Sequence, residues 1–211
     1  MLPQTDPGPS AINPGVLAFF TNQVIVQNET CLFSYQEGHR MPAIETWTTG
    51  QHLVPLSSAI WLAHEGFPGQ VRHLFLGHSA IDILCFCQLR PEWLQRPGSV
   101  AFAALGLLAT SAQVNFLKQR FTNAKVHTLF DAELTGRVTD CKVALWYSGK
   151  DASFRIADDL VQINYHNRKI IIPTVVFSLN RFEKTVALRS NIRTHKPKDF
   201  NSYHEFFVNT H

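Results

Sequence analysis

The sequence has few cysteines, and they are poorly spaced for cross-linking. Its 211 residues contain four, Cys31, Cys85, Cys87 and Cys141, which are too few and too scattered for a disulfide framework. Cys85 and Cys87 are separated by one residue rather than by the two-residue spacer of zinc and redox pairs. Three of the four lie in apolar segments, where a free thiol behaves as a small hydrophobe. We therefore expect free thiols and a reducing, cytoplasmic location.

Long hydrophobic runs and several common catalytic motifs are also missing. The first residues lack the basic and apolar regions of a signal peptide, and no apolar run approaches the roughly 18 residues of a membrane span. There is no internal repeat, no G-x-x-x-x-G-K-S/T phosphate loop and no G-x-S-x-G elbow. These absences predict no membrane partner and remove the main support for P-loop and α/β-hydrolase chemistry.

The overall composition is that of a globular protein with a large core. Hydrophobic residues make up 45% of the chain, including 16 Phe and four Trp. The formal net charge is only +3. A charge this small permits contact with nucleic acid without indicating it.

The central pattern is an apolar run that stops at two carboxylates. Residues 126–130 are short and β-prone, and a helical spacing then follows at Leu134, Val138, Cys141 and Leu145. Asp131 and Glu133 stand between strand and helix, at a strand's carboxyl end, where open α/β sheets keep their sites. Carboxylates two residues apart could both reach one Mg²⁺. Acids beside a helix start also favour the helix dipole, which is a purely structural interpretation.

Around this pattern, the chain from residue 71 alternates between strand and helix. Strands are expected at 71–76, 100–105 and 126–130, with helices at 80–89, at 111–120 and after 133. This order predicts a mostly parallel, Rossmann-like sheet flanked by helices. Before it, strands at 23–26, 30–35 and 44–47 form a short meander, and residues 57–65 look helical. We expect a β-rich N-terminal extension over 1–68 and an α/β domain over 69–211.

One segment concentrates positive charge. Residues 181–198 hold seven basic side chains against a single acid, Glu183. The seven are Arg181, Lys184, Arg189, Arg193, His195, Lys196 and Lys198. Two interpretations stay open, a solvated hairpin or loop and a surface that meets phosphates.

Three segments in this order resemble a Toprim domain, in the version found in primase-like and mobilisation proteins of bacterial plasmids and conjugative elements. They are the strand followed by G-H-S-A-I-D at 77–82, the strand followed by D-A-E-L-T-G-R at 131–137, and K-P-K-D-F-N at 196–201. The family pattern has E-x-x-x-D after the first strand, D-x-D-x-x-G-R after the third and a late K-D-x-N. The resemblance covers residues 69–211 and implies metal-dependent phosphoryl or nucleotidyl transfer on DNA or RNA.

Carried over by position, the resemblance assigns roles to particular residues. Asp131 matches the first Asp, Glu133 stands in place of the second, and both would hold Mg²⁺, the implied cofactor. His78 occupies the position of the catalytic Glu, so the implied catalytic set is His78, Asp131 and Glu133. The other matches are Asp82, Gly136, Arg137, Lys198, Asp199 and Asn201. Phosphate contacts are expected from Arg137, Arg189, Arg193, Lys196 and Lys198.

The departures from the family pattern bear on catalysis. Histidine at position 78 loses the negative charge of the Glu, and neutral imidazole prefers softer metals than Mg²⁺. Glu133 is one methylene longer than Asp, and a shift of about 1 Å at a reacting centre can cost on the order of a hundredfold in rate. The sequence therefore predicts a degenerate Toprim-like accessory protein of DNA mobilisation or replication, which binds nucleic acid or a protein partner with reduced or lost catalysis.

Two alternatives remain open at this point. One is an active metal-dependent nuclease or primase with an altered acidic site, since a histidine can act as a general base near neutral pH. The other is a structural interaction module without a nucleic-acid role, in which Phe200, Tyr203, Phe206 and Phe207 would pack an oligomer interface. The oligomeric state itself is not predicted.

Overall fold

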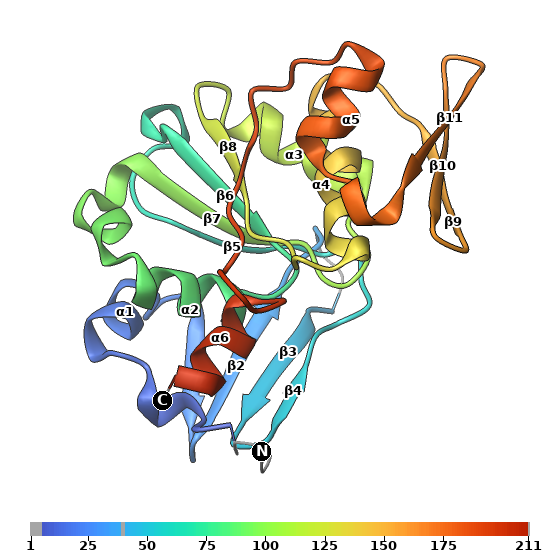
Figure 1. Cartoon of the computed structure of the whole chain (residues 1–211). Helices are drawn as coiled ribbons and strands as arrows, with labels where there is room; N and C mark the ends of the chain where they lie inside the picture. Colours follow the sequence, from blue (N-terminus) through green and yellow to red (C-terminus); the bar gives the residue numbers. More distant parts are fainter. Residues whose placement is uncertain (1–5, 39–40, 211) are drawn as a thin grey trace.

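The computed structural model describes residues 6–38 and 41–210 and shows a mixed α/β fold with three separate sheets (Figure 1). Its strands are β1 (Val24–Gln27), β2 (Thr30–Tyr35), β3 (Ala43–Thr48), β4 (Gln51–Leu53), β5 (Trp61–His64), β6 (His73–Gly77), β7 (Val100–Ala104), β8 (Lys125–Thr128), β9 (Ser153–Ala157), β10 (Leu160–Tyr165), β11 (Arg168–Pro173) and β12 (Arg193–Thr194). Its α-helices are α1 (Pro14–Phe19), α2 (Ala80–Leu89), α3 (Ser111–Arg120), α4 (Leu134–Tyr147), α5 (Leu179–Val186) and α6 (Tyr203–Thr210).

The central sheet has five strands in the order β12-β8-β6-β7-β5. Strand β6 pairs in parallel with both β7 and β8, and β12 pairs in parallel with β8, whereas β5 is antiparallel to β7. The expected alternation of β6, α2, β7, α3, β8 and α4 is confirmed. The other two sheets are antiparallel throughout, so the fold is mixed α/β, and the mostly parallel, Rossmann-like arrangement is not confirmed.

Helices cover both faces of the central sheet. On one face Phe75 and Phe102 pack against α2, whose side chains from Ala80 to Cys87 are all buried. On the other face Leu74 and Leu76 pack with residues of α3 and α4, including Val114 and Val143. Because side chains alternate between the two faces along each strand, the central sheet contributes residues to two hydrophobic cores.

The helix expected over residues 57–65 is wrong, because Trp61–His64 forms the edge strand β5. Trp61 and Ala63 point into the core around α2, while Leu62 packs against the core around α3. A short stretch that is apolar on both faces has no strand-like alternation, so its periodicity resembles that of a buried helix.

The three strands of the predicted meander are present as β1 to β3, and β4, which was not predicted, extends them to a four-stranded antiparallel sheet. Its inner face carries Phe33, Tyr35 and Trp47, which are fully buried against the core that contains α2. Helix α6, at the other end of the chain, lies across this sheet, and its Phe207 packs on Trp47 (Figure 1). Strand β5, which precedes position 68, joins the central sheet. The division of the chain into a 1–68 extension and a 69–211 domain stays a prediction.

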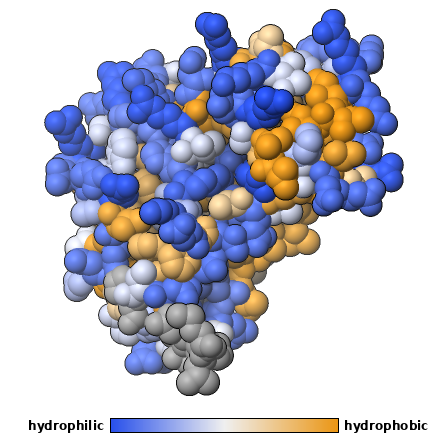
Figure 2. Space-filling model, in the orientation of Figure 1, coloured by the Kyte–Doolittle hydropathy of each residue, from blue (hydrophilic) through white to orange (hydrophobic). Residues whose placement is uncertain are grey.

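The third sheet, β9 to β11, packs on α4 and α5 through residues such as Val161, Ile163 and Phe182. Helix α5 lies in the basic segment and was not predicted there. Ser178 accepts a hydrogen bond from Arg181 N at its start, and Leu179 and Phe182 are buried beneath it. Figure 2 shows a hydrophobic patch over this region, where Val175 and Val176 are exposed.

The sequence predicted neither disulfides nor membrane-spanning segments. All four cysteines are free and buried, as predicted. Burial raises the pKa of their thiols, to about 11 for Cys31, so they remain protonated. Within the described residues, no helix combines the length and the hydropathy that crossing a bilayer requires.

Candidate functional site

The two strands that carry the predicted site residues lie side by side. Leu76 of β6 is opposite Thr128 of β8, and Leu129 N donates to Leu76 O over 2.7 Å. The residues that follow these strands therefore meet at the carboxyl edge of the central sheet. The His78 ring packs on Phe130 with centroids 4.6 Å apart, and Asp131 is the next residue. The expected proximity of the two segments is thus observed.

The turn at Asp131 packs directly on the first turn of α4. A Cβ atom at Gly136 would lie 2.7 Å from both the N and the C atoms of Asp131, and would overlap its carbonyl oxygen. Only glycine allows the helix to approach this closely. Glu133 occupies the N-cap position of α4, and its side chain makes no capping hydrogen bond. Gly136 therefore fixes the acidic turn against the helix, as its position in D-A-E-L-T-G-R requires.

The ammonium group of Lys196 lies among three oxygen atoms at this edge. Its Nζ donates to Phe130 O over 2.5 Å and to Asp131 O over 3.0 Å. It also forms an ion pair of 2.8 Å with Asp140 Oδ2, whose side chain is almost fully buried in α4. Two carbonyls and a carboxylate are ligands that a metal cation would also take. Here the cation is supplied by the protein itself.

The ionisation of the site follows from burial and from this charge arrangement. Burial, together with neighbouring carboxylates including Asp82, raises the pKa of Asp131 to about 7 against the opposing effect of Lys196. Burial also raises the pKa of Asp140 against the opposing effect of Lys196. The pKa of His78 is lowered by burial, so its imidazole is neutral near pH 7, and its Nδ1 lies 3.1 Å from Gly106 O.

The Mg²⁺ site that the Toprim resemblance implies at Asp131 and Glu133 stays a prediction, since Mg²⁺ usually takes only one or two carboxylates. Among residues 6–38 and 41–210, no group of three or more His, Cys, Asp or Glu side chains is placed to hold a metal ion. The Asp131 carboxyl has a pKa near neutrality, and the ammonium of Lys196 already lies 3.0 Å from its carbonyl. A divalent cation would have to compete with that fixed positive charge.

The late K-D-F-N segment reaches the same edge through its backbone. Asn201 O accepts a hydrogen bond from Ala132 N over 2.7 Å, inside the acidic turn. The side chains of Lys198 and Asp199 are exposed, and the backbone of Asp199 is left-handed, with φ of 65°. The structure thus brings this segment beside Asp131, although its own ionisable side chains face solvent.

Asp82 uses both oxygens of its carboxylate in hydrogen bonds within the protein. It is buried at the start of α2, where Oδ2 accepts from Ser79 Oγ over 2.7 Å and Oδ1 accepts from His204 N over 2.9 Å. The carboxylate therefore sits at the beginning of α6, where negative charge stabilises the helix. Tyr203 and Phe207 are buried in the core that α6 covers, so these two aromatic residues do not form an exposed interface.

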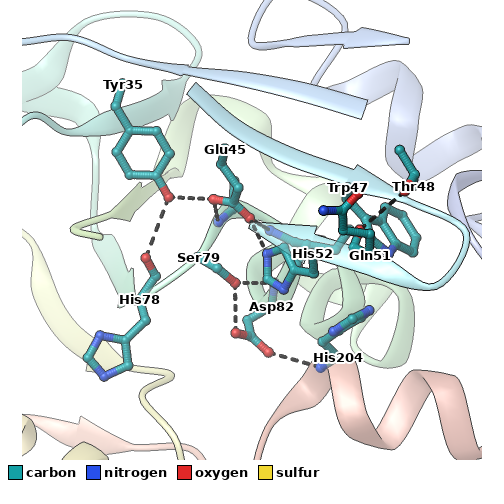
Figure 3. A network of polar contacts seen from close by, with 12 residues as sticks. Tyr35, Glu45, Trp47, Thr48, Gln51, His52, His78, Ser79, Asp82 and His204 are labelled. Atoms are coloured by element: carbon teal, nitrogen blue, oxygen red, sulfur yellow. Dashed lines mark hydrogen bonds and ion pairs between the residues drawn. The ribbon is translucent and has the colours of Figure 1, made fainter. Parts of the chain in front are cut away.

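A buried carboxylate that the sequence analysis missed ties the N-terminal sheet to this edge (Figure 3). Glu45 of β3 accepts hydrogen bonds from Ala80 N over 2.8 Å and from Ile81 N over 3.1 Å, at the start of α2. It also accepts from the hydroxyl of Tyr35 over 2.5 Å and pairs with His52 over 2.9 Å. An acid on the same strand face as Trp47, in A-I-E-T-W-T, was the available signal for a buried role.

The remaining predicted phosphate contacts are distributed differently. Arg189 and Arg193 are exposed. Arg137, in contrast, is half-buried, and its guanidinium donates to Phe177 O over 2.9 Å and to Thr174 O over 3.3 Å. It therefore attaches the segment after β11 to α4. Asp140, the partner of Lys196, was also missed, although an acid between Val138 and Cys141 on a core-facing helix was a signal.

Comparison with known proteins gives little further information. The sequence matches no protein-family model and no curated protein. A solved structure of the bacteriophage T7 lagging-strand DNA polymerase interacting with primase domains of two gp4 subunits, bound to an RNA/DNA hybrid and dTTP, is similar at 12% identity. The match covers 65% of this chain and 72% of that chain, with a TM-score of 0.41. A likeness of this size leaves the function to be inferred from the side chains.

Proposed function

We propose that the protein is a Toprim-like accessory protein of DNA mobilisation or replication that binds nucleic acid with reduced or lost catalysis. The observation that carries the proposal is a row of exposed basic side chains on the segment that delivers Lys196 to the acidic turn. The row is Arg181, Lys184, Arg189, Arg193 and Lys198. In the described part of the chain, none of these five forms an ion pair.

Unpaired surface cations of this kind suit a polyanion. The segment runs from α5 to β12, which pairs with β8 in the central sheet, and then reaches the turn at Asp131 with Lys196 (Figure 1). Its one acid, Glu183, accepts hydrogen bonds from Ser190 N and Oγ and neutralises none of the five. Phosphates of a nucleic acid strand would release counterions on binding here, which makes salt dependence the expected signature.

The same segment supports the reduced catalysis. Lys196 supplies positive charge at the strand ends, and Asp131, with a pKa of about 7, is only partly ionised near neutral pH. Lys196 holds the acidic turn through its contacts with Phe130 O, Asp131 O and Asp140. His78, Asp131 and Glu133 then belong to a surface that contacts nucleic acid or a partner.

Binding is tested by fluorescence anisotropy with labelled single- and double-stranded DNA and RNA at about 50 and 200 mM salt. We expect measurable binding that weakens by tenfold or more over this range, since several phosphate contacts give a steep salt slope. The double substitution Arg189→Gln and Lys198→Gln should lower that slope by about 2. The matched control is Arg168→Gln with Lys169→Gln, two exposed basic residues of β11. Absent or salt-independent binding would overturn the proposal.

Lost catalysis is tested separately. Wild-type protein is assayed for DNA cleavage and primer synthesis with Mg²⁺ or Mn²⁺, and calorimetry measures binding of each metal alone. We expect no turnover and no saturable binding of either ion. Turnover that disappears in Asp131→Ala would instead establish the active alternative.

A further inference from the structure

A pocket of about 360 Å³ lies at the opposite edge of the central sheet, where β6 and β7 begin. It is lined by Arg72, His73, Glu92, Trp93, Gln95, Arg96, Ser99 and Val100. The volume is within the range of small-ligand sites. None of these residues belongs to the carboxyl-edge site.

The pocket is surrounded by positive charge without partners. Arg72 and Arg96 line it and are exposed, and the charges of Lys125 and Arg193 act on His73 beside it. Among the described residues, none of these four forms an ion pair. Glu92 is the single acid in the lining. A cavity with this balance attracts an anion, and arginine pairs are well suited to phosphate.

Two flat rings give the pocket an apolar side. Trp93 is half-buried and meets His73 edge to face, with centroids 4.9 Å apart. Trp93 also packs on Phe75 at 4.8 Å, which anchors it to the sheet below. A ring held in this way can stack with a planar base at low entropic cost.

His73 is held in place by a chain of three histidines that crosses the sheet. His73 Nδ1 lies 3.0 Å from His127 Nε2, and His127 Nδ1 lies 2.9 Å from His195 Nε2. Both ring nitrogens of His127 are therefore used in hydrogen bonds to the other two histidines. The ring nitrogen of His73 that remains for a ligand is Nε2. This fixed ring adds one directional polar contact to the two arginines.

We propose that this pocket binds a nucleotide, with its phosphate on Arg72, Arg96 and His73 and its base against Trp93. The ligand is either a free nucleotide or the phosphorylated 5′ end of a strand, since both present the same chemistry. The inference goes beyond the proposed function and does not depend on it, because a free nucleotide can bind even if no strand does.

The test is calorimetric titration of the full chain with AMP, inorganic phosphate, and two short single-stranded oligonucleotides that differ only in a 5′-phosphate or 5′-hydroxyl. We expect saturable AMP binding at least tenfold tighter than that of inorganic phosphate. The double substitution Arg72→Gln and Arg96→Gln should weaken AMP binding by tenfold or more. Because both side chains are exposed, this variant should fold normally. The control pair Arg168→Gln and Lys169→Gln should leave AMP binding unchanged.

A second variant isolates the base. Trp93→Phe should weaken AMP binding and leave inorganic phosphate binding unchanged, which a purely structural role would not produce. A 5′-phosphorylated strand that binds more tightly than both AMP and the 5′-hydroxyl strand would identify the strand end as the ligand. Equal affinity for the two strands, with saturable AMP binding, would identify the free nucleotide. No saturable AMP binding, or equal affinity for AMP and inorganic phosphate, would overturn the proposal. If the Arg189→Gln and Lys198→Gln variant loses strand binding but still binds AMP, the result concerns the proposed function and not this pocket.

Discussion

The carboxyl and amino edges of the central sheet differ in whether their basic side chains have partners within the protein. At the carboxyl edge, Lys196 lies within 3.0 Å of two carbonyls and the buried carboxylate of Asp140, so its charge is satisfied inside the protein. At the amino edge, Arg72 and Arg96 border a pocket without an ion pair to any described residue. The difference separates a cation that stabilises the fold from cations that are available to a ligand. Substitutions at the two edges should therefore differ sharply in their effect on stability.

The largest effect is expected for Lys196→Met. Removing the ammonium leaves Asp140 buried without its partner, and breaking a buried ion pair typically costs about 3–5 kcal/mol. The free energy of unfolding, measured by urea titration, should fall by about this amount. Adding Asp140→Asn should recover part of the loss, because the unpaired charge is then removed. A Lys196→Met protein as stable as the wild type would show that the pair contributes nothing.

Acid should weaken the fold through the histidine chain. Burial, His195, His73 and the nearby cations lower the pKa of His127 to about 3, below the ordinary 6.5. Between these values the unfolded chain binds a proton that the folded chain does not, so stability falls as pH falls, by about 1.4 kcal/mol per pH unit. Urea titrations from pH 7 to pH 4.5 measure the slope. In His127→Gln the slope should be shallower, and an unchanged slope would assign acid sensitivity to other groups.

Gly136→Ala tests the packing that shapes the carboxyl edge. The new methyl group would overlap the Asp131 backbone, and overpacking of this kind costs about 1–3 kcal/mol. Gly98, which precedes β7 at the amino edge, provides the matched control, because a Cβ atom added there would have nothing within 4 Å. Thermal unfolding should show a lower Tm for Gly136→Ala than for Gly98→Ala. Equal values would mean that the turn at Asp131 moves freely.

The smallest effect is expected at the amino edge. Arg72→Gln and Arg96→Gln each remove an exposed charge that has no ion pair in the described structure, so stability should change by no more than about 0.5 kcal/mol. Urea titration of each variant checks this value. A loss of several kcal/mol would mean that these arginines hold the fold together, and the contrast between the two edges would disappear.

The sequence predicted the features that depend on local pattern. The strand, acidic turn and helix around Asp131 are present as predicted. They were predictable because the change from extended to helical periodicity is visible in consecutive residues. The placement of His78 beside this turn also followed, since consecutive parallel strands end at one edge. The strand at Trp61–His64 was mistaken for a helix because its sequence is apolar at consecutive positions, which removes the alternation of polar and apolar side chains.

The features that were missed depend on contacts between distant residues. Lys196 was expected to meet phosphate, yet it pairs with Asp140, and nothing near either residue in the sequence reveals the other. Glu45 likewise receives two of its hydrogen bonds from Ala80 and Ile81, more than thirty residues away. A buried charge is identified by its partner, and the partner becomes visible only when the chain is folded.

The three linked histidines have a consequence of their own. Each neutral ring carries one N–H, so the two hydrogen bonds can both point from His195 toward His73 or both point the other way. The arrangement therefore has a direction, and all the rings must exchange tautomers together for it to reverse. A ligand that accepts a hydrogen bond from His73 would select one direction and impose it on His195, the residue next to Lys196.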